Sequence, residues 1–356
     1  MPKYTMRDVA RLAGASVATV SAVINGTATV SEHLTAKISE AMKALDYHPD
    51  GVARSLKVGR TQVIGMVVPD LTNAFFPDVI RGVEDAARAA GYSVILCNSN
   101  EESEQEKRHL STLFSRRVDG VLLACSDAAA AYDSLVRRRF PIVFVDRIPQ
   151  GLPHSGVSTD NEEAGRQATR HLIGLGHAQI AFIAGNLNHS PHAERLSGFR
   201  KAMQESNLAV RDEYLRMGDQ TMESGHACGL DLMRLPQPPT AIITSNNRML
   251  LGLMRVFNEL HVPCPEQVSV VGFDDFAWTQ HFTPPLTVVA QPAHEMGKRA
   301  MEILLAKIRA GEGGEQETRV IRLQPELRVR NSTTRAHDFK GARGRAQTAR
   351  GGRSER

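Results

Sequence analysis

The first 25 residues place apolar side chains at helical spacing in two short segments separated by a glycine. Thr5 and Asp8 have the spacing of a capping box, which predicts a first helix that begins after Thr5 and ends at Gly14. Ser16 is placed to cap a second helix that ends near Asn25. The side chains predicted to face inward from these two helices are Val9, Ala10, Leu12, Ala13, Val20, Val23 and Ile24.

A third helix is predicted over residues 32–45, with Ser31 at its N-terminal cap. Two short helices joined by a tight turn and followed by a third are typical of a helix-turn-helix, although a plain three-helix bundle gives the same pattern. The second helix can enter a DNA major groove because its outward residues are small. These outward residues are Val17, Ala18, Thr19, Ser21 and Ala22.

From residue 61 onward, short apolar runs alternate with helical stretches such as 77–90 and 104–116. The alternation occurs twice, over about 61–160 and 161–290, and predicts an α/β core of two doubly wound parallel-sheet lobes with a cleft between them. Segments 286–291 and 318–330 are expected to return the chain between the lobes. The predicted strands are 63–68, 93–97, 120–124, 142–145, 180–184, 241–244 and 268–273.

Polar and aromatic side chains follow these strands, at the edge where such sheets bind ligands. Carboxylate, amide and guanidinium groups hydrogen-bond the hydroxyls of a sugar, and rings stack on its apolar faces, so the set favours a carbohydrate. Trp278, the only tryptophan, is as suited to packing as to stacking on a ligand. The residues that follow the strands are Asp70, Asn73, Phe75, Phe76, Asp146, Arg147, Asn246, Asn247, Asp274, Asp275 and Trp278.

The net charge of +4 is unevenly distributed along the chain. Residues 1–60 carry eight basic and five acidic side chains, 61–330 carry 28 and 32, and 331–356 carry seven and two. Basic ends on an acidic body suggest a polyanionic partner at the ends. The Gly/Arg/Ala-rich segment 331–356 is expected to be a disordered basic tail.

Several classes of protein are disfavoured by what the sequence lacks. The start of the chain has no apolar core of a secretory signal, and no run of about 18 apolar residues occurs, so a cytoplasmic location is expected. The four cysteines have no CxxC spacing, which favours free thiols over a metal site or disulfides. No GxSxG, HExxH or P-loop motif is present, so we expect no catalytic residues, cofactor or metal. A solute-binding module of a transport system remains the alternative for the two-lobed core.

The stretch TMRDVARLAGASVATVSAVINGTATVS, followed by LDYHPDGVARSLKVGRT, resembles the lactose-repressor (LacI/GalR) family, and the similarity continues to about residue 330. The resemblance implies a DNA-binding head over 1–48, with a DNA-contacting set that includes Thr5. It implies that Val17 and Ala18 contact base edges, and that Ser16, Thr19, Ser21 and Asn25 contact phosphates or hold the helix. Ala22 stands where the family commonly has arginine, which removes a fork that recognises guanine.

Residues 49–60 resemble the family's hinge helix, which is too short to be stable alone and orders when two copies pack together on DNA. The resemblance assigns Leu56 as the apolar wedge that enters the minor groove and kinks the duplex. Ala53 allows close approach to the groove or to the partner helix, and Arg54 and Lys57 belong to the same contact segment.

For the core, residues 61–330, the resemblance implies a periplasmic-binding-protein type of fold that binds a small effector. Arg195, Asn246 and Asp274 match effector-contacting positions, and Phe75 or Phe76 matches a ring-stacking position. Trp278 is carried over with this set, as is His189, which stands where a purine-responsive relative has arginine. His189 and His192 also leave open an anionic ligand such as a sugar acid.

The resemblance further implies a homodimer on a pseudo-palindromic operator of double-stranded DNA. The family's interface uses helices that match 77–90 and 249–260. We expect a sugar-like effector to release the operator, with a corepressor-dependent repressor as the alternative. The tail has no leucine heptad, which favours a dimer over a tetramer.

Overall fold

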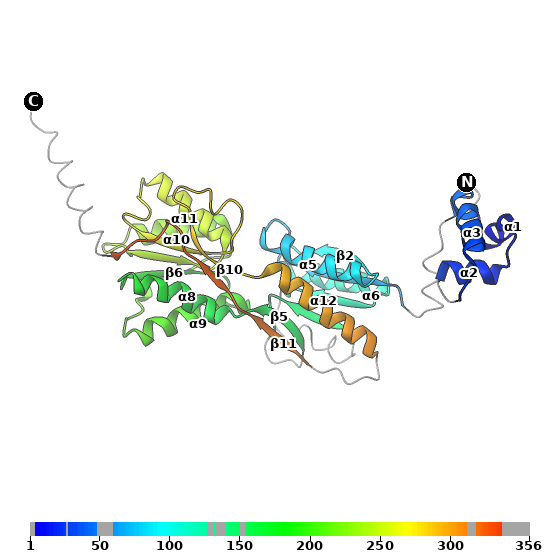
Figure 1. Cartoon of the computed structure of the whole chain (residues 1–356). Helices are drawn as coiled ribbons and strands as arrows, with labels where there is room; N and C mark the ends of the chain where they lie inside the picture. The colour runs from blue at the N-terminus through cyan, green and yellow to red at the C-terminus, as the bar shows by residue number, and fades with distance from the viewer. Residues whose placement is uncertain are drawn as a thin grey trace, which may run out of the picture. The chain divides into compact units, whose positions relative to one another are not determined.

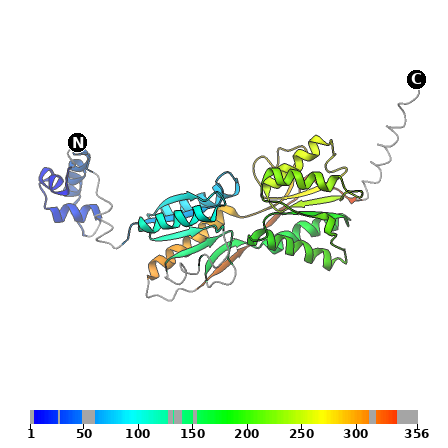
Figure 2. The ribbon, with the colours of Figure 1, turned by 180° about the vertical axis from the view of Figure 1, so that it is seen from behind.

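The computed structural model describes residues 4–25, 28–47, 60–126, 132, 140–149, 154–311 and 318–336. The chain forms two compact units, Met1–Gln62 and Val63–Arg356 (Figures 1 and 2). Most of the predicted hinge segment 49–60 lies outside the described residues.

The first unit contains three helices, α1 (Met6–Ala13), α2 (Val17–Asn25) and α3 (Glu32–Ala44), as the sequence predicted. The Asp8 carboxylate accepts hydrogen bonds from the Thr5 backbone amide at 2.9 Å and from the Thr5 hydroxyl at 2.7 Å. Gly14 ends α1 in the left-handed conformation, with φ of 62°. Leu12 was predicted to face inward and is 56% exposed, because the buried face of α1 consists of Val9, Ala10 and Ala13.

The first lobe of the second unit is built on a six-stranded sheet with the order β11-β5-β4-β3-β1-β2. All neighbouring strands in this sheet are parallel. The strands are β1 (Val63–Val68), β2 (Ser93–Asn98), β3 (Gly120–Leu123), β4 (Ile142–Val145), β5 (Ser155–Thr159) and β11 (Val320–Leu323), and the helices of this lobe are α5 (Phe75–Ala89), α6 (Ser103–Ser115) and α12 (Ala293–Ala310).

The second lobe is built on a second six-stranded sheet with the order β12-β10-β9-β8-β6-β7. Its neighbouring strands are parallel, apart from the pair of β12 with β10. The strands are β6 (Ile180–Ala184), β7 (Leu215–Met217), β8 (Ala241–Thr244), β9 (Ser269–Phe273), β10 (Thr287–Ala290) and β12 (Glu326–Arg328), and the helices are α8 (Asn161–Gly174), α9 (Ser190–Glu205), α10 (Met222–Met233), α11 (Asn247–Glu259) and the short 3-10 helix η2 (Asp212–Tyr214).

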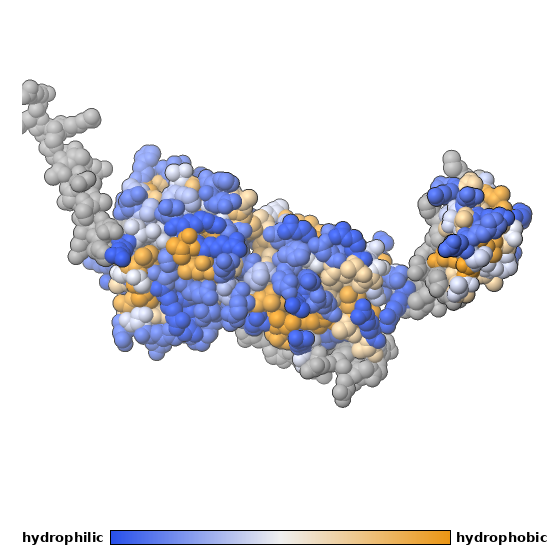
Figure 3. Space-filling view, in the orientation of Figure 1, coloured by the Kyte–Doolittle hydropathy of each residue, from blue (hydrophilic) through white to orange (hydrophobic). Residues whose placement is uncertain are grey.

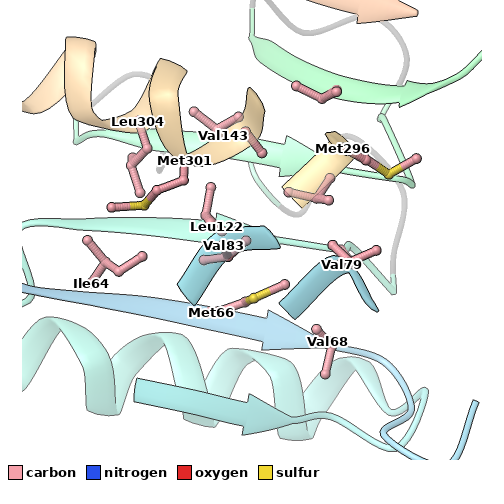
Figure 4. Packing of buried hydrophobic residues seen from close by; sticks show 14 of the residues in the cluster. Ile64, Met66, Val68, Val79, Val83, Leu122, Val143, Met296, Met301 and Leu304 are labelled. Atoms are coloured by element: carbon pink, nitrogen blue, oxygen red, sulfur yellow. The ribbon is translucent and has the colours of Figure 1, made fainter. Parts of the chain in front are cut away.

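The sequence predicted that one lobe ends and the other begins near residue 160. In the structure, each lobe contains segments from both sides of this point, because the chain passes between the lobes three times. It enters the second lobe after β5, returns to the first at α12, and leaves again between β11 and β12. Helix α12 belongs to the first lobe because Met296, Met301 and Leu304 pack into the same apolar cluster as Ile64 and Val79 (Figure 4).

Strands β10, β11 and β12 lie in the segments that were expected to return the chain between the lobes. Strands β5 and β7 lie outside every predicted strand or return segment, and both depart from the apolar runs used to find the others. Strand β5 has the sequence SGVST and buries Ser155, Ser158 and Thr159. The hydroxyls satisfy their hydrogen bonds inside the lobe, where Ser155 accepts from the Arg319 amide and Thr159 donates to Gln291. Strand β7 is only three residues long.

The helices that cover the sheets pack in close pairs at reciprocal glycines. A side chain on Gly297 of α12 would overlap the Val79 carbonyl of α5, and one on Gly82 of α5 would overlap the His294 carbonyl of α12. Glycines also make the close approach in the α8–α9 and α10–α11 pairs. These positions are Gly165, Gly198, Gly225 and Gly252.

The predicted tail begins later than residue 331. Ser332 is fully buried, accepts a hydrogen bond from the Thr287 amide at 2.8 Å and donates one to the Val270 carbonyl at 2.7 Å. The Thr334 carbonyl is hydrogen-bonded to His177 of the second lobe at 2.9 Å. Residues 331–336 therefore belong to the core, and residues 337–356 lie outside the described part of the chain.

Within the described residues, no helix has the length and apolar character needed to cross a lipid bilayer. All four cysteines are free thiols.

Candidate functional site

The predicted recognition helix α2 presents small side chains at its N-terminal end. The Ser16 hydroxyl accepts a hydrogen bond from the Thr19 amide at 3.0 Å, so the predicted cap is confirmed. Val17 is 42% exposed, Ser16 and Ala18 are exposed, and Thr19, Ser21 and Ala22 are partly buried. The side chain of Asn25 lies outside the description. The exposed surface of α2 is thus small enough to approach base edges.

The predicted hinge contacts lie outside the described residues. This applies to Ala53, Arg54, Leu56 and Lys57. Their roles stay predictions from the family resemblance.

A cavity lies between the two lobes of the second unit, at the carboxyl ends of the parallel strands. Eight of the eleven predicted effector residues line it: Asn73, Phe75, Phe76, Asp146, Arg147, Arg195, Asn246 and Asp274. Pro191, His192, Gln220 and Gln291 complete the lining. This combination of aromatic rings, carboxylates, amides and guanidiniums is the set that hydroxyls and an apolar sugar face require.

Arg195 is a cation of the cavity that is fixed by two hydrogen bonds and an aromatic ring. Its Nε donates to Asn161 Oδ1 at 2.8 Å, its Nη1 donates to the Ser245 carbonyl at 2.6 Å, and its Cζ lies 4.2 Å from the centre of the Phe273 ring. The side chain is 3% exposed. These contacts hold the guanidinium in one orientation before any ligand binds.

Asp146 and Asp274 occupy equivalent places in the two lobes, directly after β4 and β9. Both have a left-handed backbone, with φ of 63° and 69°, an unusual conformation for a non-glycine residue. Asp274 accepts hydrogen bonds from Gln291 Nε2 at 2.6 Å and from Asn247 Nδ2 at 2.7 Å. Backbone strain at both positions is typical of a functional site.

The Asp146 carboxylate differs from Asp274, because no described residue donates a hydrogen bond to it. It is 7% exposed. Burial raises the pKa of the Asp146 carboxyl to about 6, against the opposing charges of Arg147 and Arg195. A buried carboxylate with free acceptor capacity is stabilised by a ligand that brings hydroxyl donors.

Two side chains of the lining also hold the fold. Asn246 caps α11, because its Oδ1 accepts a hydrogen bond from the Met249 amide at 2.8 Å. Gln291 lies where the chain leaves β10 for α12, and its Oε1 accepts from the Thr159 hydroxyl at 2.8 Å. Because Gln291 also donates to Asp274, the cavity is connected by hydrogen bonds to the crossover between the lobes.

Two residues of the lining, His192 and Gln220, belong to a chain of hydrogen-bonded neutral groups. Ser245 accepts from the Gly185 amide, which leaves its hydroxyl proton for His192 Nδ1 at 3.0 Å. His192 Nε2 then donates to Gln220 Oε1 at 2.8 Å, and Gln220 Nε2 donates to His189 Nδ1 at 3.1 Å. Burial lowers the pKa of His192 well below its usual value and that of His189 to about 4, so both imidazoles are neutral at pH 7.

Three predicted effector residues do not line the cavity. Asp70 forms an ion pair of 2.6 Å with Arg248 and accepts a hydrogen bond from the Thr72 hydroxyl. His189 lies behind Gln220, to which it is hydrogen-bonded. Trp278 packs between Phe276 and Phe282 and against the core of the second lobe, which is the packing role that the sequence left open.

Two residues of the cavity lining, Gln220 and Gln291, were not predicted, because no sequence pattern marks them. Gln220 follows the unpredicted strand β7, and Gln291 lies at a crossover whose path depends on α12. A left-handed backbone at Gln220, with φ of 74°, marks it as unusual only once the structure is known. His192 was noted as a possible ligand contact, and it does line the cavity.

Comparison with known proteins agrees with this architecture. Residues 5–50 match the family model described as bacterial regulatory proteins, lacI family, and residues 61–334 match the model of periplasmic binding proteins and sugar binding domain of the LacI family. The chain belongs to the LacI family. It is therefore a DNA-binding transcription regulator with a helix-turn-helix head, and the family and fold predicted from the sequence are confirmed.

Individual LacI-family members resemble the chain over most of its length. The transcriptional repressor PurR of Vibrio campbellii is 38% identical over 330 residues, covering 92% of this chain and 98% of that protein. The ribose operon repressor of Escherichia coli is 38% identical over 306 residues, covering 85% and 93%. The crystal structure of the lac repressor dimer bound to operator and the anti-inducer ONPF superposes with a TM-score of 0.82, 28% identity and coverage of 94% and 100%.

Proposed function

We propose that this LacI-family regulator is a repressor that binds a monosaccharide between its lobes and then releases a pseudo-palindromic operator. The observation that carries the proposal is Asp146, a buried carboxylate of the cavity that accepts no hydrogen bond from the side chains and amides of the described residues. Phe75 and Phe76 supply the apolar face that a sugar ring packs against. D-Ribose is the first candidate, since a relative with 38% identity is named for the ribose operon.

The contacts between the lobes suggest how ligand binding changes operator binding. Asn247 Nδ2 donates to Asn73 Oδ1 at 2.9 Å across the cleft, and the same amide contacts Asp274 in the cavity. A ligand held by both lobes favours the arrangement in which these contacts form. Asn73 lies just before α5, and Asn247 is the first residue of α11. The shift is passed through these two helices to the spacing of the two hinge segments of a dimer.

Operator release is the direct test. An operator is first selected from random palindromic duplexes with the purified protein, and binding is followed by fluorescence anisotropy while monosaccharides, sugar acids and nucleobases are titrated. Release by a monosaccharide alone supports the proposal. Tighter DNA binding on addition of ligand would instead indicate a corepressor-dependent repressor, and ligand binding with no selected operator would indicate a solute-binding module.

We propose that the protein acts as a homodimer through α5 and α11. A groove of the second lobe is lined by Leu251 and Met254 of α11 together with Phe282 and Pro284. Figure 3 shows apolar surface over the region of α10 and α11. An exposed groove with apolar lining suits a twofold interface, in which the same surface of each copy is buried.

Replacing Leu251 with aspartate is therefore expected to convert the dimer to a monomer, because the interface would bury an unpaired charge. Sedimentation velocity measures the change, and Asn258→Asp at the same groove serves as a milder control. An unchanged dimer in the Leu251 variant would place the interface elsewhere.

Leu56→Ala is expected to weaken operator binding and to reduce DNA bending, with the folding stability unchanged, because the wedge that stabilises the kink is removed. The bend angle is measured by energy transfer between the ends of a labelled duplex. Unchanged affinity and bend angle in this variant would contradict the wedge assignment.

Sugar binding is expected to weaken as the pH falls below about 6, because Asp146, with its pKa raised to about 6, then loses the charge that accepts ligand hydroxyls. The folded-state pKa lies above the unfolded value, so the same group contributes stability that is present at low pH and lost as the pH rises through 6. Calorimetric titration between pH 5 and 8 measures the affinity, and Asp146→Asn is expected to remove the pH dependence.

A further inference from the structure

The second guanidinium of the cavity, that of Arg147, is held from both sides. Its Nη1 and Nη2 donate to Glu101 Oε2 and Oε1 at 2.6 and 2.7 Å, a two-pronged pair within the first lobe. From the second lobe, Gln220 Oε1 accepts a longer bond from Nη2 at 3.4 Å. Arg147 is 6% exposed, whereas the Glu101 side chain, at 37% exposed, faces partly to solvent.

The loop that contains Glu101 has a strained backbone. Asn100 and Glu101, in the loop after β2, have left-handed conformations with φ of 52° and 61°. The Glu101 amide donates to the Pro69 carbonyl at 2.9 Å, which anchors the loop to the end of β1. The hydrogen bonds and the charge of Arg147 lower the pKa of Glu101, against the effect of partial burial, so this carboxylate is ionised at pH 7.

The net charge of the side chains around the cavity disfavours an anionic ligand. Arg147 and Arg195 are opposed by Asp146, Asp274 and Glu101, so this set of five side chains carries one net negative charge. The lining residues His192 and Gln220 are neutral, as is His189, which is hydrogen-bonded to Gln220. Two guanidiniums would ordinarily attract a phosphate or a carboxylate, but here one of them is already paired in the two-pronged geometry that such a ligand would use.

We propose that Glu101 is a specificity-determining residue of the effector site, which occupies Arg147 and thereby restricts the cavity to uncharged polyhydroxylated ligands. The inference rests on the proposed function and narrows it: sugar acids and sugar phosphates are rejected, and the anionic ligand left open by the two histidines is disfavoured. Gln220, on the opposite lobe, also positions Arg147. When the lobes close, the Gln220 side-chain oxygen accepts a hydrogen bond from the guanidinium, which leaves fewer of its N–H groups for an anion.

The test compares Glu101→Gln with Glu102→Gln. Both variants remove one negative charge from neighbouring exposed positions, but the ion pair of Arg147 is formed with Glu101, so long-range charge effects are matched. The probes are D-ribose, D-ribonate, D-ribose 5-phosphate and inorganic sulfate, with binding measured by calorimetry. The wild type is expected to bind D-ribose at least about 100-fold more tightly than either anionic sugar. Glu101→Gln is expected to narrow this ratio by about tenfold, the effect of one unit charge at close range.

The outcomes separate this inference from the proposed function. An anion that binds the wild type as tightly as D-ribose, or a ratio that changes equally in both variants, would overturn the role of Glu101. If no sugar binds any variant, the monosaccharide proposal fails, and sulfate still decides the role of Glu101. Saturable sulfate binding gained by Glu101→Gln alone supports it, and sulfate binding that is equal in the two variants contradicts it.

Discussion

Arg195→Met is expected to abolish effector-induced operator release while the free protein still binds DNA. Methionine fills the volume of the aliphatic stem but leaves the Ser245 carbonyl and Asn161 Oδ1 without their donor. It also removes the cation that faces Asp146 and Asp274 across the cavity. We expect effector affinity to fall by at least about 100-fold, the usual loss when a buried charged hydrogen-bond partner is removed.

The measurement combines calorimetric titration of the effector with anisotropy of a labelled operator. Arg200→Met is the matched control, since Arg200 lies on the same helix, α9, with its side chain exposed. Urea unfolding of both variants separates lost binding from lost folding, because the buried contacts of Arg195 also contribute to stability. An Arg195 variant that binds effector within about threefold of the wild type would remove Arg195 from the site.

The sequence was most informative where a local signal determined the structure. The caps at Thr5 and Ser16 and the glycine turn at Gly14 fixed the first two helices, because each involves atoms three or four residues apart. Strands made of uninterrupted apolar residues, such as β4 and β8, were found with their observed bounds. The edge of the sheets therefore followed, and with it seven residues of the cavity lining; the eighth, Arg195, lies on α9 and was assigned only by the family resemblance.

The remaining features depend on contacts between residues distant in sequence. Strand β5 is polar, and only its position between β4 and β11 shows why its hydroxyls are buried. The sequence around Ser332 is typical of a polar tail, and only the hydrogen bonds of Ser332 with Thr287 and Val270 show that it belongs to the core. Gln220 enters the cavity because His192 orients it, a relation between residues 28 positions apart. No periodicity or propensity encodes these pairings.

The effector cleft also depends on the α5–α12 contact, which the sequence did not reveal. Helix α12 follows the second lobe in the chain and must dock on the first, so its packing holds the crossover segment that contains Gln291. Gly297 lies against the Val79 carbonyl and the Val83 amide of α5. Main-chain atoms of a helix cannot move aside as a flexible side chain can, so this position has no room for a methyl group.

Gly297→Ala is therefore expected to lower the free energy of unfolding by about 3 kcal/mol or more, because the helices must separate along their whole contact. Gly174→Ala is the matched control: Gly174 is the last residue of α8, and no heavy atom lies within 4 Å of the position its methyl group would take. That variant is expected to be neutral or more stable by about 0.5 kcal/mol, since alanine restricts the unfolded chain. Urea unfolding followed by circular dichroism measures both. Equal stability of the two variants would show that α5 and α12 can separate freely, and that the crossover to the cleft is held by other contacts.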